Sequence, residues 1–92
     1  MRIAFDPAKR ALTLERRKLD FAFAGLVFDA KHMTRADDRR DYGESRFISI
    51  GRLGRDVVVP VWTPRGNARR IISMRRANGR EKAFFDADMA RP

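Results

Sequence analysis

The sequence contains no cysteine and only one histidine, His32. Disulfides and thiolate metal sites are therefore excluded, and a single histidine in a polar stretch is more often solvated than bound to a metal. No run of the sequence approaches the roughly 20 apolar residues of a membrane-spanning helix, and we find no secretory signal. We expect no cofactor, no membrane association and a cytoplasmic location.

The sequence has an excess of positive charge. Lys and Arg number 21 against 12 Asp and Glu, so the formal net charge is +9 and the isoelectric point is near 11.4. A domain this basic attracts polyanions, and nucleic acid is the first partner to consider. Hydrophobic residues make up 43% of the 92 residues, which is typical of a folded chain. We expect a single domain over residues 1–92.

The segment from Asp56 to Ala77 is the centre of the predicted fold. Two runs rich in β-branched residues, Val57–Trp62 and Ile71–Met74, flank the turn-forming residues 64–67, and this arrangement predicts an antiparallel hairpin. Pro60 cannot donate a hydrogen bond to a neighbouring strand, so we expect a sheet edge or a bulge near it. The basic residues that border the apolar runs are Arg65, Arg69, Arg70, Arg75 and Arg76.

Capping signals predict three helices. Asp6 before Pro7 begins a first helix that should end at about Lys18, because Asp is a good N-cap and proline is tolerated at the first helical position. Asp20 can cap a second, shorter helix, and Asn78 with Glu81 resembles a capping box for the last one. We expect the buried faces to be Phe21, Ala24, Gly25 and Phe28 in the second helix and Phe84, Phe85 and Met89 in the last.

The remaining segments complete an α+β domain. Residues 2–5 predict a short strand, and a strand from Arg46 to Ile50 should reach the hairpin through a turn at residues 51–55. Residues 31–42 are strongly polar and predict a connection that can carry a short edge strand. The predicted order is a strand, two helices, three antiparallel strands and a helix. We expect a small antiparallel sheet with the helices on one face and the other face available.

Arginine is the residue type that suggests a chemistry. Guanidinium groups bind phosphate bidentately and stay charged at any working pH, so a cluster of them can position RNA and stabilise a phosphorane-like transition state. Cleavage of RNA also needs a base for the 2′-hydroxyl and an acid for the 5′ oxygen. Glu44, two residues before Arg46, is the best-placed carboxylate. Its alternative role is a surface salt bridge with Arg46 or another strand arginine.

Several short motifs resemble the BrnT family of toxins, and the resemblance extends from about residue 3 to about residue 85. The motifs are Phe5-Asp6-Pro7-Ala8-Lys9, Leu19-Asp20-Phe21, Val27-Phe28-Asp29, Gly43-Glu44-Ser45-Arg46, Ile50-Gly51, Thr63-Pro64-Arg65, Arg70-Ile71-Ile72-Ser73-Met74-Arg75, and Ala77 with Glu81. The resemblance implies a ribonuclease of RelE-like fold. It also implies the toxin of a type II toxin–antitoxin pair, neutralised by a ribbon-helix-helix antitoxin that represses the operon.

By position, the resemblance implies that Arg65 and Arg70 are the functional arginines, with Glu44, Lys9 and Arg75 at further motif positions. The sequence also departs from the family pattern. Residues 16–18 read Arg-Arg-Lys where many relatives have Lys-His-Gly, so a histidine able to transfer protons is missing. Pro60 replaces an aliphatic residue, and Phe85 stands where a tyrosine is common.

From these observations we predict a metal-independent endoribonuclease toxin that inhibits translation by cleaving RNA. Arg65 and Arg70 are expected to stabilise the transition state, and Glu44 or Lys9 to handle protons. The expected partners are RNA and a BrnA-like ribbon-helix-helix antitoxin encoded by the adjacent gene. The alternative is a non-enzymatic, basic nucleic-acid-binding module. The residues predicted to bind RNA are Arg46, Arg75, Arg69 and Arg76.

Overall fold

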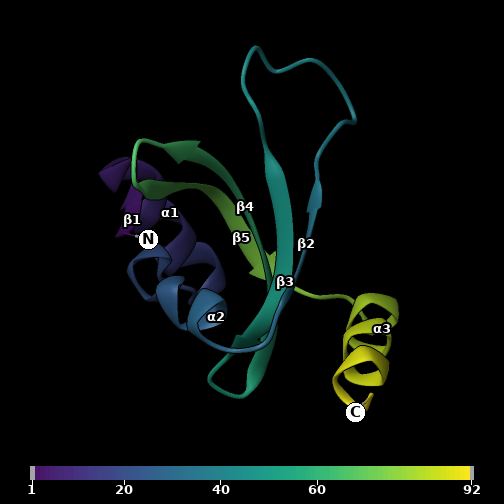
Figure 1. Ribbon diagram of the computed structural model, residues 1–92. Helices are drawn as coiled ribbons and strands as arrows, with labels where there is room; N and C mark the ends of the chain where they lie inside the picture. The colour runs from purple at the N-terminus through teal and green to yellow at the C-terminus, as the bar shows by residue number, and fades with distance from the viewer. Residues whose placement is uncertain (1, 92) are drawn as a thin grey trace.

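A computed structural model describes residues 2–91, which form a five-stranded sheet with helices on both sides (Figure 1). The strand order is β1-β5-β4-β3-β2. The elements are β1 (Arg2–Phe5), α1 (Pro7–Arg17), the 3₁₀ helix η1 (Phe21–Phe23), α2 (Gly25–Asp29), β2 (Met33–Ala36), β3 (Phe47–Leu53), β4 (Asp56–Arg65), β5 (Ala68–Arg76) and α3 (Gly79–Met89). The α+β class is confirmed.

The prediction of a purely antiparallel sheet is wrong. Strands β2 to β5 pair antiparallel in sequence order, but β1 pairs with β5 in parallel. The outer edge of β5 is the place where β1 joins the sheet, and the long helical connection after β1 allows either strand direction. The short edge strand allowed for in the polar stretch is present as β2.

Helix α1 begins as predicted. The Asp6 side chain accepts a hydrogen bond from the Ala8 amide at 2.9 Å, and Pro7 occupies the first helical turn. The helix ends at Arg17 and is capped by Lys18, which has the left-handed backbone conformation (φ 59°) and whose amide donates to the Leu14 carbonyl. Lys18 therefore adopts a backbone conformation that favours glycine.

Replacing Lys18 with glycine is expected to stabilise the protein by about 1 kcal/mol, because glycine adopts the left-handed conformation without a Cβ penalty. Urea unfolding of Lys18→Gly measures the change. The matched control is Glu15→Gly inside α1, where glycine should cost about 1 kcal/mol. A loss of stability in both variants would contradict the prediction.

The second predicted helix is divided into two short elements. Asp20 caps η1 by accepting from the Ala22 amide and also forms an ion pair with Arg10 at 2.7 Å. Helix α2 then begins at Gly25. Phe21 and Ala24 are fully buried as expected, but Val27 is also fully buried whereas Gly25 is only half-buried.

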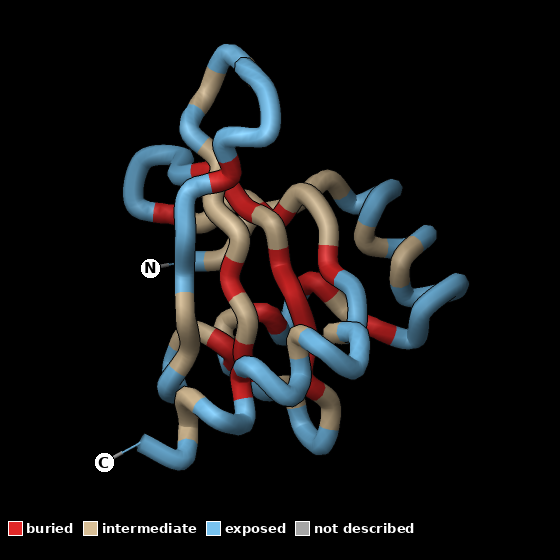
Figure 2. Tube along the Cα trace, turned by 90° about the vertical axis from the view of Figure 1, so that its right-hand side faces the viewer, coloured by how far each residue is buried: buried red, intermediate tan, exposed pale blue. Residues whose placement is uncertain are grey.

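Most of the hydrophobic core lies between the sheet and η1 and α2. We call this side of the sheet the core face and the opposite side the distal face. Buried segments gather along the central strands (Figure 2). The core cluster contains Leu19, Phe21, Ala24, Val27, Val58, Trp62, Ile71 and Met74, with Ile3, Phe5, Phe28, Phe47 and Leu53 packed against it.

The central hairpin is present and longer than predicted, because β4 and β5 continue to Arg65 and Ala68. Two residues form its turn: Gly66, which has a positive φ of 58°, and Asn67. Pro60 lies in a central strand, and the expected irregularity is a register shift at Val61/Trp62. The predicted turn at residues 51–55 is wrong, since β3 extends to Leu53 and the chain reverses at residues 54–55.

Helix α3 has the predicted capping box, in which Asn78 accepts from the Glu81 amide and the Glu81 side chain accepts from the Asn78 amide. It packs on the distal face, opposite α2 (Figure 1). The expectation that all helices share one face is therefore wrong. Val57 and Val59 are buried on the distal face, so apolar side chains on both faces of β4 require cover on both sides.

Candidate nucleic-acid interface

The pairing register decides which arginines share a face. Arg70 lies opposite Thr63, and Ile71 opposite Trp62. Directly opposed residues of antiparallel strands point to the same side, and Ile71 and Trp62 belong to the core. Thr63 and Arg70 therefore lie on the distal face, as does Arg65, two residues along β4.

Glu44 joins two arginines at the edge of this face. Its carboxylate accepts from Arg65 Nη2 at 3.1 Å and from Arg46 Nε at 3.3 Å. The loop that carries Glu44 is held by Thr63 Oγ1, which donates to the Ser45 carbonyl at 2.6 Å. We call Glu44, Arg46 and Arg65 the Glu44 cluster. It brings together three of the residues selected from the sequence.

Opposing effects set the pKa of Glu44. Desolvation raises it, but the hydrogen bonds and charges of Arg46 and Arg65 together outweigh desolvation, so the pKa lies below its ordinary value. The carboxylate is therefore ionised near neutral pH. A carboxylate with a lowered pKa is a weak proton acceptor, but it holds the two guanidinium groups in place.

Sequence reasoning missed Tyr42 beside this cluster. The Arg46 guanidinium carbon lies 4.0 Å from the centroid of the Tyr42 ring, and that of Arg40 lies 5.0 Å from it. These are cation–π distances. An aromatic ring within a basic run was the available signal, because stacking surfaces next to guanidinium groups are typical of single-stranded nucleic-acid sites.

Asp37 was also missed, because its polar stretch was expected to be a solvated connection. The side chain is buried and accepts hydrogen bonds from Arg39 Nε and Nη2 at 2.7 and 2.8 Å. The hydrogen bond from Arg39 lowers the pKa of Asp37 to about 2. The β2–β3 connection thus contains a buried carboxylate that holds the exposed guanidinium group of Arg39.

Arg75 lies opposite Val59 on the distal face and forms a bidentate ion pair with Glu81 of α3, at 2.7 and 2.9 Å. The hydrogen bond from Arg75 lowers the pKa of Glu81 to about 2. In the free chain Glu has a pKa of about 4.3. Ionised Glu81 therefore stabilises the folded state above the ordinary pKa, and this contribution is lost as the pH falls towards 2.

Glu81→Gln is expected to lower the free energy of unfolding by about 1 kcal/mol or less at pH 7, because glutamine preserves the capping box but not the charge. The difference from the unsubstituted protein should shrink steadily between about pH 4.5 and pH 2. Urea unfolding across this pH range measures it. A difference that stayed constant with pH would show that the charge of Glu81 contributes nothing.

Lys9 lies apart from the Glu44 cluster. It lines a depression of about 190 Å³ between α1 and β5, together with Leu12, Thr13, Arg16, Arg17, Ile72 and Ser73. Arg17, also on α1, donates to the Met74 carbonyl at 2.9 Å. Among the hydrogen bonds and ion pairs of residues 2–91, none joins Lys9 to Glu44.

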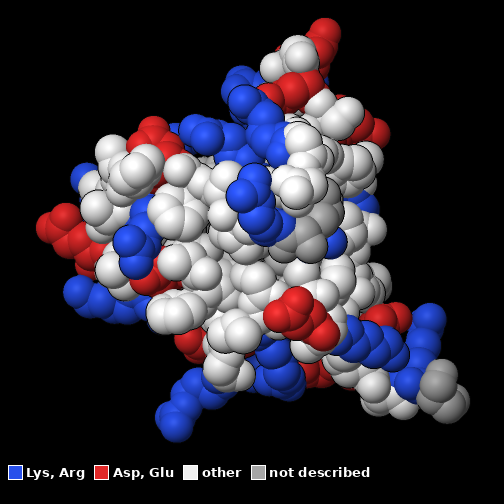
Figure 3. Space-filling model, turned by 60° about the vertical axis from the view of Figure 1, so that its left-hand side comes forward, with Lys and Arg blue, Asp and Glu red and all other residues white. Residues whose placement is uncertain are grey.

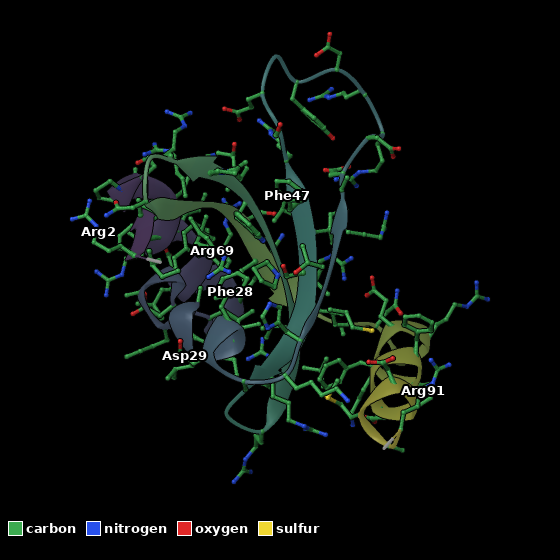
Figure 4. All side chains as sticks on the ribbon, viewed as in Figure 1. Arg2, Phe28, Asp29, Phe47, Arg69 and Arg91 are labelled. Carbon is green, nitrogen blue, oxygen red and sulfur yellow. The ribbon has the colours of Figure 1, made fainter. Side chains whose placement is uncertain are left out.

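Arg69 and Arg76 lie on the core face. The Arg69 guanidinium carbon lies 4.1 Å from the centroid of the Phe28 ring and 5.0 Å from that of Trp62 (Figure 4). Arg76 forms an ion pair with Asp56 at 3.4 Å and donates to the Arg17 carbonyl at the end of α1. The structure thus separates these two arginines from Arg65 and Arg70.

Basic side chains also form several patches around the α1 side of the molecule, with acidic side chains between them (Figure 3).

Within residues 2–91 no group of three or more His, Asp or Glu side chains is placed to hold a metal ion. His32 hydrogen-bonds the Ala30 carbonyl and packs edge-on against Phe28. None of the helices in the described part of the chain has the length and apolar character needed to span a membrane.

Comparison with protein families identifies the chain. The model of the family described as the ribonuclease toxin BrnT of type II toxin–antitoxin systems matches residues 5–81. The chain belongs to the BrnT family. The resemblance read from the motifs is thereby confirmed, and the matched range includes the Glu44 cluster, Lys9, Arg70 and Arg75. A search of curated proteins finds no match to the chain.

Membership of the BrnT family assigns a ribonuclease activity to the chain and implies two partners. One is RNA, the substrate of a ribonuclease. The other is an antitoxin, since the toxin of a type II system is neutralised by a protein. The net charge of +9 suits both partners if the antitoxin is acidic where it binds.

Proposed function

We propose that this BrnT-family protein is a metal-independent endoribonuclease that inhibits translation by cleaving RNA in the cytoplasm, and that its fold is RelE-like. The observation that carries the proposal is the Glu44 cluster next to Arg70 on one face of the sheet. Three guanidinium groups on one surface can bind successive phosphates of a single strand. We further propose that the antitoxin is a BrnA-like ribbon-helix-helix protein encoded by the adjacent gene.

In the proposed reaction the 2′-oxygen of a ribose attacks the neighbouring phosphorus, and the bond to the 5′-oxygen breaks. The products are a 2′,3′-cyclic phosphate and a free 5′-hydroxyl. Arg65 and Arg70 stabilise the negative charge that develops on the phosphoryl oxygens. The proton of the 2′-hydroxyl passes to Glu44 or Lys9, and the leaving 5′-oxygen takes a proton from that same group or from water.

The contacts of Glu44 favour a positioning role over proton transfer. Its pKa lies below the ordinary value, and a general base works best with a pKa near the operating pH. By holding Arg65 and Arg46, it reduces the freedom that these side chains would otherwise lose on binding RNA. Lys9 reaches RNA only if the strand extends from the Glu44 cluster across β5 to the depression beside α1.

Among the other arginines, Arg46 and Arg75 are proposed to contact the phosphate backbone, since both lie on the distal face or at its edge. The contacts of Arg69 with Phe28 and of Arg76 with Asp56 support a packing role for these two residues.

RNA cleavage in excess chelator tests the proposal. Purified protein is incubated with a defined single-stranded RNA, with EDTA or with magnesium, and the 3′ ends of the products are identified. We expect equal cleavage in both conditions and ends that carry a 2′,3′-cyclic phosphate or 3′-phosphate. Cleavage that stops in EDTA and returns with magnesium would overturn the metal-independent mechanism.

A further inference from the structure

An apolar groove lies between α3 and the distal face of the sheet. Its volume is about 500 Å³, far larger than the depression beside α1. The floor is formed by residues of β2, β3 and β4, and one wall by α3. The residues that line it are Met33, Thr34, Arg35, Ile48, Ser49, Ile50, Val59, Arg80, Glu81 and Phe84.

The wall of the groove is exposed although it is apolar. Phe84 keeps 66% of its surface accessible, whereas its neighbour Phe85 is 1% exposed and holds α3 against the sheet. Two ion pairs, Arg75–Glu81 and Arg52–Asp86, also tie α3 to the sheet. The fold therefore does not need Phe84 for its own packing. A concave apolar surface left open in this way is typical of a protein-binding site.

The rim of the groove is positively charged. Arg35 and Arg80 line it, and both are exposed. The carboxylate of Glu81 is already engaged by Arg75, so it does not cancel the charge of the rim. An occupant with an apolar side chain flanked by carboxylates would complement both the floor and the rim.

The groove is continuous with the proposed RNA surface. Ile48 lies on its floor, opposite Val61, and Arg46 of the Glu44 cluster is two residues before Ile48. A protein segment seated in the groove can therefore extend over the Glu44 cluster and exclude RNA. Phe23 and Leu26 are also exposed apolar residues, at 58% and 55%. They lie on η1 and α2 across the sheet, so a partner bound there would leave the Glu44 cluster uncovered.

We propose that this groove is the docking site of the antitoxin. A segment of the antitoxin inserts an apolar side chain between Phe84 and Ile48, and its flanking carboxylates pair with Arg35 and Arg80. This inference rests on the proposed toxin function. It adds that the antitoxin neutralises the toxin by contacting α3 and the part of the distal face that lines the groove, and not by contacting the helices on the core face.

The test is calorimetric binding of the ribbon-helix-helix protein encoded by the neighbouring gene to the purified toxin and its variants. Phe84→Ala and Arg80→Glu are each expected to raise Kd at least about tenfold, the loss typical of an interface anchor. Phe23→Ala is the matched control for the exposed ring, and Lys82→Glu is the control for the charge reversal on the same helix. Both controls should bind as tightly as the unsubstituted protein.

RNA cleavage by each variant separates the docking-site hypothesis from the ribonuclease hypothesis. Phe84→Ala and Arg80→Glu should cleave RNA normally while escaping neutralisation. Unchanged antitoxin affinity in both variants, or a loss confined to Phe23→Ala, would overturn the docking site but leave the ribonuclease proposal intact. Failure of the unsubstituted toxin to bind the neighbouring protein would overturn both the docking site and the proposed antitoxin.

Discussion

Alanine replacement of Arg65 and Arg70 together is expected to lower the rate of RNA cleavage by on the order of 10³-fold or more, because each group stabilises charge that develops only in the transition state. The register supports their joint action. Arg65 pairs with Ala68 and Arg70 with Thr63, which makes the two arginines diagonal neighbours with Cα atoms about 7–8 Å apart. The register shift at Val61/Trp62 lies before the pairs Thr63–Arg70 and Arg65–Ala68, so it does not separate the two arginines.

RNA binding should fall only partly in the same variant, because Arg46 and Arg75 remain. Each lost phosphate contact should reduce the slope of log affinity against log salt by about 0.7 for a single strand. Lys31→Ala with Arg55→Ala is the matched control, since it removes two exposed cations that belong neither to the Glu44 cluster nor to Arg70 and Arg75. Full cleavage by Arg65→Ala/Arg70→Ala would contradict the proposed mechanism. An unsubstituted protein that binds RNA without cutting it would favour the non-enzymatic alternative.

Phe21→Ala is expected to lower the free energy of unfolding by about 3–5 kcal/mol. Phe21 is fully buried at the centre of the core, and its ring packs edge-on against Phe5 with centroids 6.3 Å apart. Truncation removes most of the buried side chain and leaves a cavity under η1. Because a domain of this size is stabilised by only about 5–15 kcal/mol, the loss should be visible as a large fall in the urea midpoint.

Phe23→Ala is the internal control for this measurement. It removes the same side chain two residues away, but Phe23 is 58% exposed, and surface substitutions usually change stability by about 0.5 kcal/mol or less. Equal effects of Phe21→Ala and Phe23→Ala would show that η1 does not cover the main core. Cleavage by the folded fraction of Phe21→Ala should be normal, since Phe21 lies on the core face.

Features that depend on residues close together in the chain were predictable from the amino-acid sequence. The Asp6–Pro7 start of α1 and the capping box of Asn78 and Glu81 were predicted correctly, because each cap is satisfied within a few residues along the chain. The predicted strand that begins near Arg46 is present as β3, in which Phe47 packs against the core and Ile48 and Ile50 line the groove on the other face, as the two-residue period of a strand requires. The family motifs identified the chain without any structure.

Which side chains share a surface depends instead on how the strands pair and pack. Arg69 and Arg70 are adjacent in sequence and alike in chemistry, but one stacks on Phe28 and the other lies on the distal face. Such assignments depend on strand register, and a single bulge reverses the faces of all residues beyond it. The parallel pairing of β1 and the position of α3 are likewise set by long-range packing. The groove beneath Phe84 exists only because of that packing, so no local pattern in the sequence could reveal it.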